Sequence, residues 1–392
     1  MSSRRRLANL VRLPSHHPSE MARSLAAYEV FYPAAALYAA VALPASVLAM
    51  TGATSAPQAL SSPAGHAHEM LLGFALAVVA GNQLGPVHGP AIGWLLLLWI
   101  AARGAFLLAP GSLIALLLNA VFAGALAFRV VPRLTTAAKK WRNRALPAVI
   151  AALASAAVAW ELSRCAANAG VPASLVLATV ALFALLMLFM GGRIIAPAVA
   201  GQFLRQGARL DAPVQPRVEA ALLVAGASFA VAQLLPGLQI VAVLAGGATG
   251  ALAAIRLIRW RLWEIRGRPD LWCLSAGYGW LSLGLLATAG SIACGCYVDA
   301  LVHLITIGAL GTLTFNVMAM FWRLKSRRGL MDANLIVWGT ALLAAATGAR
   351  VLGAFESTNW LYVAAGCWAM AFTLLLVLFW RDRRRYVRKD GV

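Results

Sequence analysis

The sequence predicts an all-α protein, a polytopic transmembrane helical bundle of about twelve spans. Of its 392 residues, 61% are hydrophobic and only 12% are charged, which is more apolar than a soluble chain of this length can bury. The apolar residues come in blocks of about twenty, each long enough to cross roughly 30 Å of hydrocarbon as a helix. A transmembrane β-barrel would show alternating apolar and polar residues instead, so helices are predicted.

The spans can be placed in order because prolines, glycines and basic loops separate the apolar blocks. A helix starts or stops at low cost at proline and glycine, and a lysine- and arginine-rich stretch disfavours the membrane interior. The predicted spans are 30–51, 64–84 (from Pro63), 90–108 (from Pro90), 111–131 (after Pro110), 146–168, 172–195 (after Gly170), 217–235, 238–257 (after Pro236), 271–293, 299–321, 334–354 and 360–380.

The basic residues predict the orientation of the bundle. Of 33 lysines and arginines, 29 lie in the N-terminal tail and in alternate joints, namely 129–144, 205–217, 256–268, 323–328 and 381–389. Such loops stay in the cytoplasm, so both termini are predicted to be cytoplasmic. The weakest joint is 85–90, where His88 is the one basic candidate.

This charge pattern also predicts the domain organisation and the partners. We expect a basic tail over residues 1–27, a single transmembrane domain over 28–382 and a second basic tail over 383–392. The formal charge of +20 is spread between apolar blocks rather than gathered on one face, so it indicates membrane topology and not nucleic-acid binding. The lipid bilayer is therefore the predicted partner.

One stretch carries most of the candidate chemistry. His66, His68 and Glu69 open the span 64–84, and His303 lies about one turn into the span 299–321. Both spans are predicted to run from outside to inside, so the three histidines share a layer near the outer surface. Ionisable groups inside membrane spans suggest a functional site, and three histidines can hold a metal ion or a haem iron.

Helix geometry divides these residues. His66 and His68 are about 200° apart around an ideal helix, so they serve one small centre only if the first turn is irregular. His66 is expected on the face of Glu69 and Gly73. Neutral, hydrogen-bonded histidines near a helix start are the alternative. Spans two and ten also share a pattern of histidine, glycine five residues later and a following asparagine (His68, Gly73, Asn82; His303, Gly308, Asn316).

Other polar groups are predicted in the same outer half. Arg103 is expected to pair with a haem propionate or with Glu161, or to form a structural ion pair. Cys294 and Cys296 precede His303 and have thiolates that suit Cu(I), with plain interfacial thiols or a disulfide as the alternative.

These residues resemble a known family. The run from Gly65 to Phe74 looks like the histidine motif of the NnrS family, and Gly192-Arg193, the segment 274–281 and the segment 303–312 are similar to its further motifs. The resemblance implies a twelve-span protein of the bacterial inner membrane that contains haem and copper and is linked to nitric oxide metabolism. His66, His68 and His303 would then be ligands and Glu69 would orient a ligating ring, with Arg103, Cys294 and Cys296 as further candidates.

The chain departs from the family pattern at two cytoplasmic-side positions. Ser275 stands where relatives commonly place a histidine, and the segment 323–329, which includes Ser326, replaces a histidine-containing turn. This puts the copper content in doubt. The predicted function is a haem-binding protein, with copper as a second metal, that handles nitric oxide or related nitrogen oxides. A secondary transporter and a scaffold that has lost its cofactors are the alternatives.

Overall fold

A computed structural model describes residues 26–55, 57–85, 89–166, 171–265, 267–325 and 333–389 of the chain. His88, Ser326, residues 1–25 of the N-terminal tail and residues 390–392 therefore lie outside the described residues. Helices make up the described part and no strand occurs in it, as the sequence predicts.

The helices follow one another with short connections. In chain order they are α1 (Ala27–Met50), η1 (Gln58–Leu60), α2 (Pro63–His68), η2 (Glu69–Ala75), α3 (Leu76–Gln83), α4 (Gly89–Leu108), α5 (Leu113–Ala137), η3 (Trp141–Arg144), α6 (Ala145–Ala166), α7 (Ala173–Arg205), α8 (Pro216–Ala232), α9 (Gln239–Arg259), η4 (Leu262–Glu264), α10 (Pro269–Cys294), α11 (Val298–Leu301), η5 (Leu304–Gly311), α12 (Thr312–Lys325), α13 (Ala333–Leu352) and α14 (Asn359–Lys389).

Eleven of the predicted spans are long and apolar enough to cross a membrane within the described residues. The remaining one, predicted over 217–235, forms the helix α8, which has 17 residues and a length of roughly 25 Å at 1.5 Å per residue. Two helices run beyond their predicted spans. α7 continues to Arg205, past the predicted end at residue 195, and α14 continues to Lys389, into the predicted basic tail.

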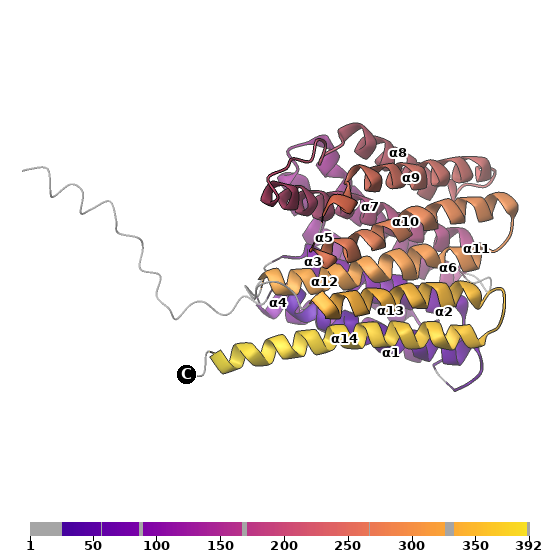
Figure 1. The fold of residues 1–392 in the computed structure, drawn as a ribbon. Coiled ribbons are helices and arrows are strands. Elements are labelled where there is room, and N and C mark those ends of the chain that lie inside the picture. Colours follow the sequence, from indigo (N-terminus) through magenta and orange to yellow (C-terminus); the bar gives the residue numbers. More distant parts are fainter. Residues whose placement is uncertain are drawn as a thin grey trace, which may run out of the picture.

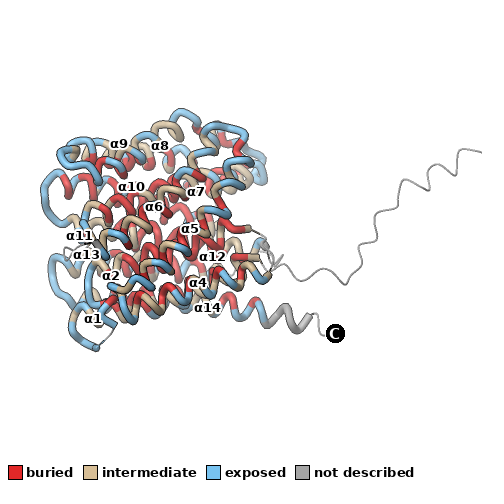
Figure 2. The backbone as a smooth tube through the Cα atoms, turned by 180° about the vertical axis from the view of Figure 1, so that it is seen from behind, coloured by how far each residue is buried: buried red, intermediate tan, exposed pale blue. Residues whose placement is uncertain are grey.

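The helices pack side by side into one bundle (Figure 1). α8 and α9 lie at one side of it, α1 and α14 lie at the other, and α10 and α12 lie between them. Buried residues follow the middle of the bundle and exposed residues its outside and its ends (Figure 2). The second span, Pro63–Gln83, is the most enclosed, since 83% of its most apolar 18-residue stretch is buried. This span therefore lies at the centre and not against lipid.

The second and tenth spans are not regular α-helices. η2 and η5 are π-helical segments, in which each N–H bonds to the carbonyl five residues earlier, and each begins directly after a histidine, His68 or His303. Both contain the glycine of the pattern shared by these spans, Gly73 or Gly308. The short helices α2 and α11 that precede them lie at one end of the bundle, away from the C-terminal end of α14 (Figures 1 and 2).

Candidate functional site

The start of the second span is fixed by local chemistry. The Ser62 hydroxyl accepts a hydrogen bond from the Gly65 N–H at 3.1 Å, and Pro63 occupies the first helical position, so α2 is capped in the usual way. Gly65 lies so close to the Ala59 carbonyl that a Cβ would stand 1.7 Å from its oxygen. This contact positions His66 and His68 relative to the preceding loop.

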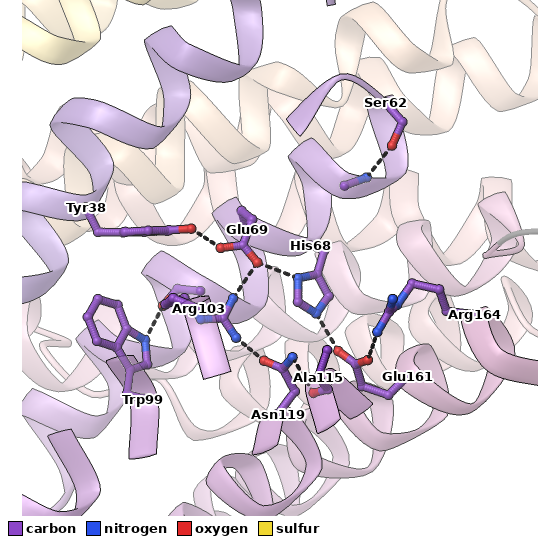
Figure 3. A network of polar contacts seen from close by, with 12 residues as sticks. Tyr38, Ser62, His68, Glu69, Trp99, Arg103, Ala115, Asn119, Glu161 and Arg164 are labelled. Atoms are coloured by element: carbon purple, nitrogen blue, oxygen red, sulfur yellow. Dashed lines mark hydrogen bonds and ion pairs between the residues drawn. The ribbon is translucent and has the colours of Figure 1, made fainter. Parts of the chain in front are cut away.

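His68 is the centre of a buried polar network (Figure 3). It is fully buried, its Nδ1 lies 2.7 Å from Glu69 Oε1, and its Nε2 lies 2.6 Å from Glu161 Oε1 on α6. Its ring stacks on Phe106 with the ring centres 3.8 Å apart. The imidazole therefore joins the second span to α6.

The two carboxylates at the ends of this bridge have further partners from three helices. Glu69 accepts hydrogen bonds from the Tyr38 hydroxyl of α1 and from Arg103 Nη1 of α4, the latter at 2.5 Å, and Arg164 of α6 donates to Glu161. Glu69 is the first residue of the π-segment η2. Gly73, one turn further, leaves room for Arg103: a Cβ there would lie 2.9 Å from Nη1.

The network is balanced in charge apart from its histidine. Arg103 forms an ion pair with Glu69, and Arg164 forms one with Glu161. Both nitrogens of His68 face carboxylate oxygens, and a neutral imidazole has a single N–H.

Arg103 forms a structural ion pair, one of the alternatives that the sequence left open. It donates to Glu69 and to the Asn119 side chain of α5, and not to Glu161, which was its other predicted protein partner. Asn119 in turn donates to the Ala115 carbonyl at 2.8 Å, one turn earlier in α5. The Arg103 side chain is 4% exposed, and its guanidinium connects the buried network to α4 and α5. The distance along the chain hid this pairing, because Glu69 is 34 residues away.

His66 and His303 form a separate, half-buried group. His66 Nδ1 lies 3.1 Å from the Ser46 hydroxyl of α1, and His303 Nδ1 lies 2.7 Å from the Asp299 carbonyl. The two rings are near enough to interact electrostatically with each other and with Arg350 of α13. The expectation that the second and tenth spans bring histidines to a common place therefore holds for His66 and His303, while His68 faces α6.

The ring nitrogens decide which histidines fit a metal. In His66 and His303 the Nδ1 atom is held by an oxygen, and no hydrogen bond engages Nε2 within the described residues. This is the usual arrangement of a ligating histidine, whose second nitrogen is fixed by an outer partner. Both nitrogens of His68 are engaged by carboxylates. Its predicted role as a ligand stays a prediction, although the contact with Glu69 that was expected to orient it is present.

The predicted copper ligands lie at the C-terminal end of α10. Cys294 is the last residue of that helix, Cys296 follows after a left-handed Gly295, and both are exposed and free. Nowhere among the described residues do three or more histidine, cysteine or acidic side chains gather as a metal cluster. Ser275, at the position where relatives commonly have a histidine, is buried, and its hydroxyl contacts no partner in the described part of the chain.

Two participants from α1 were not predicted from the sequence. Tyr38 and Ser46 are single polar residues within the apolar block of α1, and neither belongs to a motif. Their spacing is the one feature of the sequence that could have indicated a shared role. The two lie eight residues apart, which places them near one face of a helix. That face packs against the second span.

Comparison with protein families matches residues 24–382 to the family described as NnrS protein. The chain belongs to the NnrS family. The match covers nearly the whole chain, so it includes the second span with its histidines, the Gly192-Arg193 pair of α7 and the tenth span. No curated protein matches the chain. The NnrS family relationship and the many apolar helices together make this a multi-pass membrane protein.

Proposed function

We propose that this NnrS family member is a haem-binding protein of the bacterial inner membrane that takes part in handling nitric oxide or related nitrogen oxides. In this proposal the chain crosses the membrane twelve times, with α8 as the seventh span and with both termini in the cytoplasm. The histidines at the start of spans two and ten then lie near the outer surface.

The observation that carries the proposal is that His66 and His303 are near enough to interact electrostatically. Their Nε2 atoms are available while their Nδ1 atoms are held by the Ser46 hydroxyl and the Asp299 carbonyl. A bound haem supplies an iron that takes small gaseous ligands such as nitric oxide. Arg350, within electrostatic range of both rings, would pair with a haem propionate in place of Arg103.

Copper is a second cofactor in this proposal, held by Cys294 and Cys296. Two exposed thiols separated by one residue suit the soft Cu(I) ion. The serine at position 275 is consistent with fewer metal positions than in relatives.

A secondary transporter remains the alternative from another class. Unwound helices at matching places in the two halves of the chain would support transport, because free backbone groups there coordinate ions. The two π-segments stand at such places, but each keeps the chain helical and its backbone hydrogen-bonded. This observation favours cofactor binding over transport.

An absorption spectrum of the purified protein, with iron and copper analysis, tests the proposal. We expect a haem Soret band that is lost in His66→Ala and in His303→Ala, while both variants still fold. The His16→Ala variant, in the N-terminal tail, is the matched control and should keep the band. Protein that carries no haem after expression with haem supply, or single variants that bind haem like the unmodified chain, would overturn the assignment.

A further inference from the structure

A polar cavity lies at the other end of the bundle from the histidines. It has a volume of about 410 Å³ and is enclosed by η3, the inner part of α7, the start of α8 and the end of α9. The predicted basic loops 129–144, 205–217 and 256–268 meet there. Neither the haem proposal nor the buried network uses this cavity.

The cavity carries an excess of positive charge. Four cationic side chains (Lys140, Arg142, Arg193 and Arg256) and one carboxylate (Glu219) line it, which leaves three positive charges unmatched. Glu219 is shared: Arg142 Nη1 lies 3.1 Å and Arg256 Nη2 lies 2.8 Å from its two oxygens.

Arg193 has no carboxylate partner within the described residues. It donates to the Asn143 side chain, and its guanidinium lies over the ring of Phe189, 4.3 Å from the ring centre. A planar guanidinium held against an aromatic ring has lost rotational freedom before any ligand arrives, and its fork geometry matches the oxygens of a phosphate.

The guanidinium of Arg256 is a buried positive charge that the packing of the helices accommodates. Its side chain is 3% exposed, and its Nε meets no acceptor among the described residues. Gly192 makes the room for it, since a Cβ at that position would stand 1.8 Å from Arg256 Nη2. A buried cation is costly, so an arrangement that keeps one beside an open cavity favours an anionic ligand.

Most of the remaining lining is apolar and indicates the kind of anion. Leu188, Pro197 and Val214 lie beside the charged groups, so the cavity is suited to a ligand with both an anionic and a hydrocarbon part. Basic pockets between helices at the cytoplasmic surface have the charge and depth that lipid headgroups need. We propose that this cavity binds the phosphate group of an anionic phospholipid from the cytoplasmic leaflet.

Native mass spectrometry of the detergent-purified full chain tests this proposal. Titration with phosphatidylglycerol should give adducts that phosphatidylcholine does not give at the same concentration. The double variant Lys140→Gln/Arg193→Gln should weaken phosphatidylglycerol binding roughly tenfold or more. Neither residue pairs with Glu219, so the internal ion pairs stay intact. Arg205→Gln is the matched control, because Arg205 is also exposed on α7 but bonds to Gln202 outside the cavity.

Inorganic phosphate is added in a parallel arm and binding is followed by thermal stabilisation of the protein. Stabilisation by phosphate, without a preference for phosphatidylglycerol over phosphatidylcholine, would assign the cavity to a soluble anion and overturn the lipid as its source. Equal phosphatidylglycerol adducts in the double variant and in Arg205→Gln would overturn the site itself. A tenfold loss confined to the double variant, with phosphate inert, would support the proposal.

Discussion

His68 acts structurally as a bridge between two buried acids. With both nitrogens bonded to carboxylates and its ring stacked on Phe106, it links Glu69 to Glu161. Removal of one member of a buried polar network leaves the groups that it bonded without a partner, which is far more costly than loss of an exposed ion pair. Of the three histidines predicted as ligands, His68 is thus the one whose loss should affect folding most.

The first prediction concerns this bridge. His68→Ala should lower the free energy of unfolding by about 3–5 kcal/mol, because it takes one buried partner away from each of the two buried carboxylates. The effect is measured as a fall in the thermal midpoint of the purified protein. Thr135→Ala is the control, since that side chain is exposed and bonds to the Val131 carbonyl one turn earlier in its own helix.

A double-mutant cycle separates the bridge from simple loss of packing. Glu161→Gln in the His68→Ala background should cost less than Glu161→Gln alone, with a coupling of roughly 1 kcal/mol or more. Additive losses would mean that the contact between His68 and Glu161 does not contribute to stability, and the His68 bridge would have to be abandoned.

The candidate site could be predicted from the sequence only in part, and the reason is visible in single residues. Histidines and a glutamate stand out within an apolar block, so His66, Glu69 and His303 were found from composition alone. Their partners are spread over several other helices, as Ser46 and Arg350 are, and nothing in the local pattern links them. Pairing between spans is decided by helix packing, which hydropathy does not encode.

At the scale of the elements, the two π-segments are the main departure from expectation. The sequence showed the same histidine, glycine and asparagine pattern in spans two and ten, but in uniformly apolar spans no periodicity separates a π-turn from an α-turn. The structure gives this pattern a physical meaning: each π-segment begins just after the histidine and includes the glycine. Span boundaries were predicted well where proline marks them, as at Pro63, and poorly where apolar helix simply continues, as in α7.

The close approach of α10 to η5 provides the second prediction. Gly284 of α10 lies against backbone, and a Cβ there would stand 2.9 Å from the Ile305 nitrogen and 3.0 Å from the Leu304 carbonyl carbon. Backbone cannot rotate away as a side chain can, so Gly284→Ala should separate the helices and cost about 1–3 kcal/mol of stability.

Thermal unfolding of the purified variants measures this cost, and α10 offers its own control. Gly290 is in the same helix, but a Cβ at that position would meet no atom within 4 Å. Gly290→Ala should therefore be neutral or stabilising by up to about 1 kcal/mol through helix propensity. If both alanine variants unfold alike, α10 and η5 do not approach each other this closely at Gly284. Because η5 follows His303 directly, Gly284→Ala should also disturb the proposed haem site.

At the scale of the whole molecule, contacts between side chains show which ends of distant helices lie together. Glu161, near the end of α6, touches His68, and His66 lies within electrostatic range of His303. Cys165 follows Glu161 by four residues, and Cys294 precedes His303 by nine. Because each cysteine is within nine residues of one of these contacts, the two lie towards the same end of the bundle, and both are exposed.

This relation makes the short helix α8 decisive for the topology. If α8 crosses the membrane, the chain from Cys165 to Cys294 makes four crossings, through α7, α8, α9 and α10, and the two cysteines share a side. If α8 does not cross, three crossings remain and the cysteines lie on opposite sides. A helix of roughly 25 Å is shorter than the hydrocarbon core, but local thinning of the bilayer accommodates such a mismatch at modest cost.

The last prediction is therefore that Cys165 and Cys294 both react with a membrane-impermeant maleimide added to intact cells. Each is tested as the single cysteine of a variant in which the other four are serine. Arg209→Cys lies between α7 and α8 and is tested in a variant in which all five native cysteines are serine. It should react only after the membrane is permeabilised. Labelling of Cys165 from outside together with Cys294 from inside would remove α8 from the set of spans. It would also invert every helix that follows, so that His66 and His303 could not meet at one end of the bundle as the structure places them.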